Sequence, residues 1–171
     1  MSSSVPRTPA SSSETDDYVA IRRLQSAYAD VVTRRAWPEL SELFLPDALV
    51  EVDTRHGEVV RFERPEALAD FIGDALERFD FFEFVILNTR IEVGAGGDAD
   101  RADGRMYMCE LRTDRDTGRW NNAFGVYHDR YERRDGRWWF AHRRYHTLGR
   151  TGEERDLDVF EFPHHLRLGS L

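Results

Sequence analysis

Two aromatic-rich segments near the end of the chain are joined by Asp135-Gly136, and this pattern constrains the fold more than any other. An Asp-Gly pair favours a two-residue hairpin turn, because both central residues of a type I′ turn need a positive φ. The pattern therefore predicts two long antiparallel strands, over residues 119–131 and 138–146.

A two-residue turn also determines which residues of the two strands face each other. Arg134 then lies opposite Arg137, and every further facing pair has residue numbers of the same sum. Four such pairs share one face: Tyr131 with Phe140, Asp129 with His142, Tyr127 with Arg144, and Gly125 with His146. Because Trp138 and Phe140 lie on this face, we expect it to point inward.

Composition limits the functions open to the chain. With 171 residues and 40% hydrophobic content, one well-packed domain is expected. The net charge of −8 argues against nucleic acid or an anionic membrane as the main partner. All 24 basic residues are arginine, which excludes Schiff-base catalysis and a P-loop lysine and is typical of GC-rich bacterial genomes.

Cys109 is the only cysteine, so no internal disulfide, thiolate zinc cluster or CxxC redox pair can form. Its position in an alternating strand pattern favours a small buried side chain over a nucleophile. The first residues lack the apolar core of a signal peptide, and no apolar run approaches the ~20 residues of a membrane span. These features predict a cytoplasmic protein.

The order of the segments predicts the fold class. Residues 1–13 are rich in Ser and Pro and are expected to be a disordered tail, residues 14–149 to form the domain, and residues 150–171 to form an extension along an edge or against a partner. Apolar spacing predicts a helix from Tyr18 to Val32, and proline opens two more helices at Trp37-Pro38 and at Pro65.

Further strands are predicted over residues 48–54, 58–63, 81–93 and 104–115. Together with the closing hairpin, they indicate an α+β fold with a curved antiparallel sheet, covered on one face by three N-terminal helices. Trp139 and Tyr145 are expected on the outer face, where a large apolar surface needs a cover. A homodimer through this outer sheet face is the simplest prediction.

Three segments resemble the SnoaL-like branch of the nuclear-transport-factor-2-like (NTF2-like) superfamily. They are IRRLQSAYAD at residues 21–30, WPELSELFLPDA at 37–48, and DGRWWFAHRR at 135–144. The resemblance spans residues 15–149 and implies a cone-shaped α+β barrel whose mouth holds an apolar ligand. The family includes scytalone dehydratase, ketosteroid isomerase, polyketide cyclases and non-catalytic proteins, so the fold does not decide the function.

The sequence departs from the dehydratase at most catalytic positions. Under the resemblance, the tyrosine and aspartate of its first helix fall at Val32 and Thr33, and its third-strand histidine falls at Phe84. The serine and asparagine of its fifth strand fall at Gly125 and Tyr127. The dehydratase mechanism is therefore not expected here.

The isomerase matches more loosely, through Tyr28 on the first helix and Asp53 at the end of the first strand. A tyrosine donor and a carboxylate base are what a reaction needs to move a proton beside a carbonyl. The alternatives are that Tyr28 is a core residue, as a tyrosine in an apolar helix stripe more often is, and that Asp53 is an ordinary strand end.

The facing pair Asp129 and His142 is the main catalytic candidate, as a general acid/base pair or, alternatively, as a cross-strand pair that only stabilises the sheet. The expected ligand-binding residues are Phe84, Asn88, Tyr127, Phe140 and Arg144. His142 and His146 would lie about 13 Å apart on a strand, too far to share a metal ion. No metal and no cofactor are expected.

These observations predict a cavity that binds a small apolar molecule, aromatic, polyketide-like or steroid-like. If the protein is an enzyme, cofactor-free isomerase, cyclase or lyase chemistry is expected, with His142, Asp129, Tyr28 and Asp53 as catalytic residues. A non-catalytic ligand carrier and a structural subunit, like the small subunit of ring-hydroxylating oxygenases, remain as alternatives.

Overall fold

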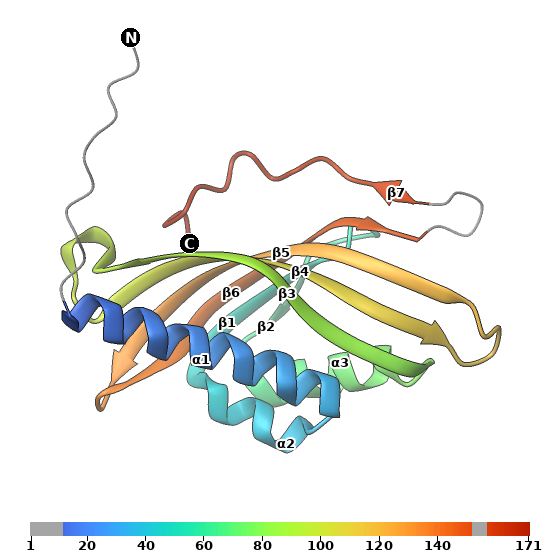
Figure 1. Ribbon diagram of the computed structural model, residues 1–171, viewed down its shortest axis with the longest axis horizontal. Helices are drawn as coiled ribbons and strands as arrows, with labels where there is room; N and C mark the ends of the chain where they lie inside the picture. The colour runs from blue at the N-terminus through green and yellow to red at the C-terminus, as the bar shows by residue number, and fades with distance from the viewer. Residues whose placement is uncertain (1–11, 152–156) are drawn as a thin grey trace, which may run out of the picture.

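The computed structural model describes residues 12–151 and 157–171, and its elements follow the predicted order (Figure 1). They are α1 (Ser12–Arg34), α2 (Trp37–Leu40), the short 3₁₀ helix η1 (Ser41–Leu43), β1 (Phe44–Asp53), β2 (Val60–Phe62), α3 (Pro65–Leu76), β3 (Phe79–Val93), the 3₁₀ turn η2 (Ala95–Gly97), β4 (Arg101–Asp114), β5 (Trp120–Arg134), β6 (Arg137–Arg150) and β7 (Asp158–Val159). The predicted disordered tail lies outside the described residues up to residue 11, and α1 begins at Ser12.

The apolar stripes of the helices explain where they pack. Ile21, Tyr28 and Val32 of α1 are almost fully buried, whereas Tyr18 at the start of the same stripe is 39% exposed. Proline at the first position of α3 costs no helical hydrogen bond, and Leu68 is buried one turn later. Within the described ranges, no helix combines the length and apolarity that crossing a bilayer requires.

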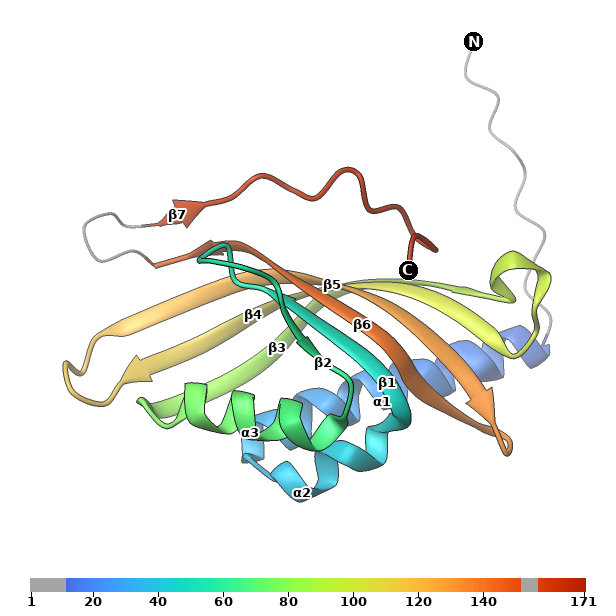
Figure 2. The same ribbon diagram turned by 180° about the vertical axis from the view of Figure 1, so that it is seen from behind.

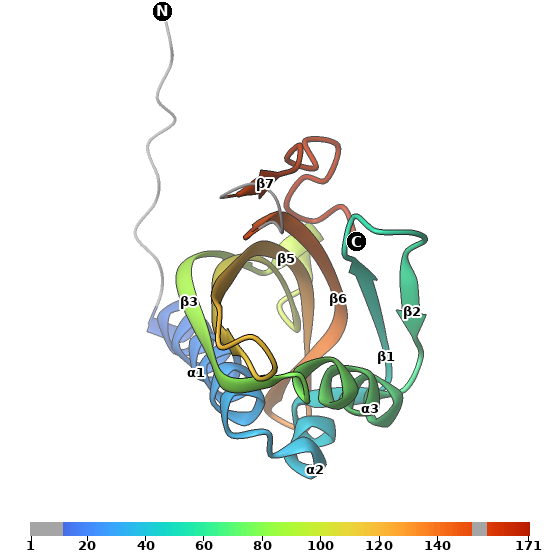
Figure 3. The ribbon, with the colours of Figure 1, turned by 90° about the vertical axis from the view of Figure 1, so that its right-hand side faces the viewer.

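The strands form one curved sheet of seven strands in the order β2-β1-β6-β5-β4-β3, with β7 added to the end of β6. The sheet curls around α1 and α3, which lie on its concave side (Figures 1 and 3). This confirms the α+β cone, with one correction, because β1 and β6 are parallel and the sheet is mixed. The long connection through α3, β3, β4 and β5 allows this parallel pairing.

The closing hairpin has the predicted turn but not the predicted register beyond it. Asp135 and Gly136 have φ values of 52° and 74°, and Tyr131 faces Phe140 as expected. The register then shifts, because β6 contains one extra residue between Phe140 and His142. Such a bulge turns the side chains that follow it to the opposite face, here as far as Thr147, after which a second extra residue in β6 reverses the alternation again.

Three predicted pairs are therefore wrong: Asp129 faces Arg143 and not His142, Tyr127 faces Tyr145 and not Arg144, and Gly125 faces Thr147 and not His146. For the same reason Tyr145, which we expected on the outer face, lies on the concave side. In β6 beyond the bulge, the concave face therefore carries Arg143 and Tyr145 in place of His142 and Arg144.

The C-terminal segment, residues 157–171, runs over the convex face of the sheet, opposite the helices (Figure 2). Phe162 stacks on Tyr107 with ring centroids 6.3 Å apart, and Arg105 donates a hydrogen bond of 3.1 Å to the Leu166 carbonyl. The chain itself thus covers part of the face that we had assigned to a dimer. The homodimer stays a prediction.

Candidate functional site

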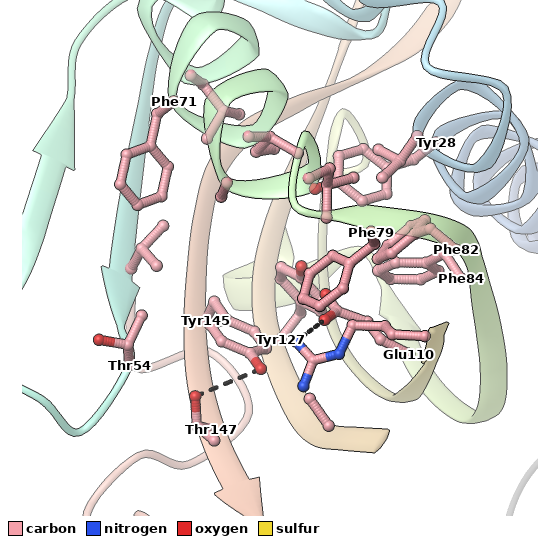
Figure 4. Close-up of a pocket in the computed structure, with 18 of the residues that line it drawn as sticks. Tyr28, Thr54, Phe71, Phe79, Phe82, Phe84, Glu110, Tyr127, Tyr145 and Thr147 are labelled. Atoms are coloured by element: carbon pink, nitrogen blue, oxygen red, sulfur yellow. Dashed lines mark hydrogen bonds and ion pairs between the residues drawn. The ribbon is translucent and has the colours of Figure 1, made fainter. Parts of the chain in front are cut away.

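A cavity of about 380 Å³ lies between the concave face of the sheet and helices α1 and α3 (Figure 4). Its apolar lining includes Leu68, Phe71, Ile72, Phe79, Phe82 and Phe84. Figure 4 shows Phe71 across the cavity from Phe82 and Phe84. A concave, largely apolar space of this size is typical of small-molecule sites.

Polar side chains gather along β4 and β6 on the floor of this cavity. Glu110 and Arg112 come from β4, and Arg112 Nη1 donates a hydrogen bond of 3.1 Å to Glu110 Oε2. Burial raises the pKa of Glu110, while the positive charge of Arg112 acts in the opposite direction. Glu110 is therefore a carboxyl group that holds its proton more tightly than an exposed glutamate.

Tyr145 leans across β5 toward β4, because Gly125 has no side chain. A Cβ at Gly125 would lie 2.2 Å from Tyr145 Cε2 and 2.7 Å from its hydroxyl oxygen. Thr147 donates a long hydrogen bond of 3.4 Å to that hydroxyl. Burial raises the pKa of Tyr145, so the phenol stays neutral and can donate a hydrogen bond into the cavity.

Arg143 forms the end of the cavity beneath α1. Its Nε and Nη2 donate to the two carboxylate oxygens of Asp129 at 2.7 and 2.9 Å, and both side chains are fully buried. The guanidinium carbon lies 4.2 Å from the ring centroid of Tyr28, 4.3 Å from that of Tyr127 and 4.0 Å from that of Phe140. Cation–π contacts and the ion pair together hold these rings in place.

Three of the residues proposed from the sequence lie in the cavity wall: Tyr28, Phe84 and Tyr127. Their roles toward a ligand stay predictions. Asp129 supports Arg143 from behind the wall and does not contact His142, which lies on the convex face.

The remaining candidates point away from the cavity. His142 Nε2 lies 3.1 Å from Glu51 Oε2, and Arg144 Nε lies 3.8 Å from the same oxygen, both on the convex face. Asp53 forms an ion pair of 3.1 Å with Arg55 on that face, because its neighbours in β1 point inward.

Asn88 and Phe140 also lie elsewhere. Asn88 follows a bulge in β3, which turns it out of the row of Phe82 and Phe84, and its exposed side chain accepts a hydrogen bond from the Thr89 amide. Phe140 is fully buried and stacks on Phe44 at 5.0 Å between ring centroids. It supports the core beneath Arg143 and does not reach the cavity.

Thr33 and Phe84, the positions of the dehydratase aspartate and histidine under the resemblance, are neighbours in space. Thr33 Oγ1 accepts a hydrogen bond of 3.0 Å from the Phe84 amide. Neither side chain can titrate in the accessible pH range. The corresponding place in this cavity therefore has no acid/base pair.

Sequence reasoning missed Glu110, Arg112 and Tyr145. A signal was present in β4, where Glu110 shares the face of the buried Met106 and Met108. A carboxylate in an otherwise apolar alternating row is a candidate for a pocket residue. In the part of the chain that the structure covers, no group of three or more His, Cys, Asp or Glu side chains is placed to hold a metal.

Comparison with known proteins identifies the family and the fold. A family model described as SnoaL-like domain matches residues 13–144. No curated protein sequence matches the chain.

Several solved structures share the fold. LinA, a hexachlorocyclohexane dehydrochlorinase, is 24% identical with a TM-score of 0.71, over 88% of this chain and 97% of LinA. A putative scytalone dehydratase from Novosphingobium aromaticivorans is 17% identical with a TM-score of 0.67, over 91% and 93% of the two chains. An NTF2-like protein with a cystatin-like fold from the same organism is 19% identical with a TM-score of 0.63, over 78% and 83%.

Proposed function

The chain belongs to the SnoaL-like family of the NTF2-like superfamily, and from this premise we propose that its cavity binds a small, largely apolar molecule and that Glu110 moves a proton on it. The ligand is an aromatic, polyketide-like or steroid-like compound. The reaction is an isomerisation, a cyclisation or an elimination that needs no cofactor.

The observation that carries this proposal is a single, partly buried carboxyl group in a largely apolar cavity. Among the described residues, Glu110 is the one carboxylate in the cavity wall. Its pKa is raised by burial, which brings it closer to neutral pH, where a group serves well both as acid and as base.

The surrounding residues have supporting roles. The phenylalanines of β3 bind the apolar body of the ligand and keep water away from Glu110. The neutral hydroxyl of Tyr145 donates a hydrogen bond to a carbonyl or leaving oxygen, while Glu110 takes up or delivers the proton. A dehydrochlorinase and a putative scytalone dehydratase share the fold, and their names support the elimination among the three reactions.

A thermal-shift screen against aromatic, polyketide and steroid-like compounds tests the binding part. A ligand at a hundred times its dissociation constant stabilises the protein by ~2.7 kcal/mol, which raises the melting temperature measurably. Compounds that bind are then incubated in D₂O with the wild type and with Glu110→Gln, and NMR detects proton exchange or product.

We expect Glu110→Gln to bind such a compound as the wild type does and to lose about 100-fold or more of the turnover. Glu83→Gln, which changes an exposed glutamate of β3, is the matched control and should keep full turnover. Full turnover in Glu110→Gln would contradict the role of Glu110. Binding without turnover in the wild type would identify a carrier, and no binding by any compound would contradict the proposal as a whole.

A further inference from the structure

The cavity wall contains more positive charge than its carboxylates neutralise. Four arginines line it, and three of them have a carboxylate partner: Arg78 with Asp114, Arg112 with Glu110, and Arg143 with Asp129. Arg150, at the end of β6, has no carboxylate within ion-pair distance among the described residues. Its Nη2 donates to the Thr54 carbonyl at 3.1 Å, a neutral acceptor that does not balance its charge.

The surroundings of Arg150 hold it at the cavity without neutralising it. Its guanidinium carbon lies 5.3 Å from the centroid of the Phe160 ring of the C-terminal segment. Asp158 on β7 acts on Arg150 only at longer range. An aromatic ring, a backbone carbonyl and the distant Asp158 leave the guanidinium free to bind an anion from the cavity.

Arg112 provides a second, independent observation. Its Nε is buried and has no hydrogen-bond partner among the described residues, although its Nη1 bonds to Glu110. The guanidinium carbon lies 4.9 Å from the centroid of the Phe79 ring, which limits how the group can turn. A buried N–H group without an acceptor costs free energy, and a ligand oxygen would remove that cost.

The strand register places Glu110 and Arg150 on either side of Ala123, with Arg112 two residues further along β4. Glu110 of β4 faces Ala123 of β5, and Ala123 faces Arg150 of β6, so these residues form a row across three strands. Because neighbouring strands are about 4.8 Å apart, the outer two backbones of this row are separated by roughly 10 Å. The methyl group of Ala123 fills little of that space, which a group the size of a carboxylate can occupy.

We propose that the ligand of this cavity carries a carboxylate on its apolar body, and that this carboxylate binds between Arg150 and Arg112 above Ala123. The inference rests on the proposed function and names the substrate class of the same site. Glu110 does not oppose the anion, because Arg112 already neutralises it. The carboxylate orients the ligand, so that its apolar body lies against Phe82 and Phe84 and its reacting carbon near Glu110.

Matched pairs of acids and amides test this inference by isothermal titration calorimetry. The probes are benzoate and benzamide, 2-naphthoate and 2-naphthamide, and anthracene-2-carboxylate and its amide. In the wild type we expect at least one acid to bind about tenfold or more tightly than its amide, because a charged hydrogen bond to a guanidinium replaces a neutral one. Added salt should weaken the binding of the acid and leave the binding of the amide unchanged.

Arg150→Gln should reduce the preference for the acid to about threefold or less and leave the affinity for the amide unchanged, which also shows that the variant is folded. Arg119→Gln, which changes an exposed arginine before β5, should keep the preference. Equal binding of acid and amide by the wild type would overturn the carboxylate inference while leaving the proposed function standing. Binding of no probe and of no compound in the screen would overturn both.

Discussion

Two carboxylate–arginine pairs lie on the concave side of the sheet, and they differ in the number of hydrogen bonds that they share and in how far they are enclosed. Asp129 and Arg143 share two hydrogen bonds, at 2.7 and 2.9 Å, and neither side chain is accessible. Glu110 and Arg112 share one of 3.1 Å, and their side chains are 20% and 15% exposed.

Under the proposed function, the same two functional groups serve stability in one place and chemistry in the other. Asp129 accepts a further hydrogen bond of 2.7 Å from Tyr131, and its side chain is fully buried, so a ligand cannot reach its oxygens. Each arginine has one buried N–H group without a partner among the described residues, Nε of Arg112 and Nη1 of Arg143, but only Arg112 and Glu110 have side chains that are partly accessible. We therefore expect the enclosed pair to control folding and the open pair to control function.

Arg143→Met should have the largest effect on stability. The substitution leaves Asp129 buried without its counterion, and breaking one side of a buried pair costs about 3–5 kcal/mol. Urea denaturation measures the loss. The double variant Asp129→Asn with Arg143→Met should recover part of it, because the uncompensated charge is removed. If the free energy of unfolding of Arg143→Met lies within about 1 kcal/mol of that of the wild type, the enclosed pair is no more important for stability than the open pair.

Gly125→Ala should have the next largest effect on stability, because it displaces Tyr145 in the cavity wall between the two pairs. The new methyl group would overlap the Tyr145 ring, since a Cβ on residue 125 falls 2.2 Å from Tyr145 Cε2. Overpacking of this kind costs about 1–3 kcal/mol, measurable by thermal denaturation. Adding Tyr145→Leu should restore stability but not turnover. If Gly125→Ala alone is as stable as the wild type, Tyr145 is not held across β5.

Glu110→Gln should change stability little, by less than about 1 kcal/mol at neutral pH. The sign of this change in stability depends on pH. Because burial raises the pKa of Glu110 above 4.5, the folded state binds this proton more tightly than the unfolded state. The stability that Glu110 contributes through this tighter proton binding is complete below pH 4.5 and is lost as pH rises through the pKa of the folded state.

Gln does not titrate, so the stability of Glu110→Gln relative to the wild type should increase as pH rises above 4.5. Urea denaturation of both proteins across this pH range provides the measurement. A variant that becomes relatively less stable with rising pH would mean that Arg112 outweighs burial, and the open pair would then resemble the enclosed one.

His142→Ala should have the smallest effect. His142 contacts Glu51 on the convex face, and Glu51 keeps Arg61 and Arg144 as partners, so the loss should be within about 1 kcal/mol. Ligand affinity and turnover should not change, because the imidazole does not reach the cavity. A large loss of turnover would support the interpretation of His142 as a catalytic residue and would contradict the assignment of function to the open pair.

Local patterns were enough to predict the helices and the closing turn. The apolar stripe from Ile21 to Val32 and the Asp135-Gly136 pair each depend on residues close in the chain, and both predictions are confirmed. The start of β1 at Phe44 was not predicted, since Phe44 continues an apolar helical spacing and becomes extended where it pairs with Phe140 of β6.

The sequence by itself determined which segments form helices and strands, and that neighbouring residues of a strand point to opposite faces. Only the tertiary structure decided which of the two alternating sets faces the cavity. A strand repeats every two residues, so one extra residue in β6 exchanges the sets and places Arg143 and Tyr145 inside and His142 outside. The bulge lies where β6 also pairs with β1, whose register shifts between Phe44 and Leu49, so segments far apart in the sequence meet at it.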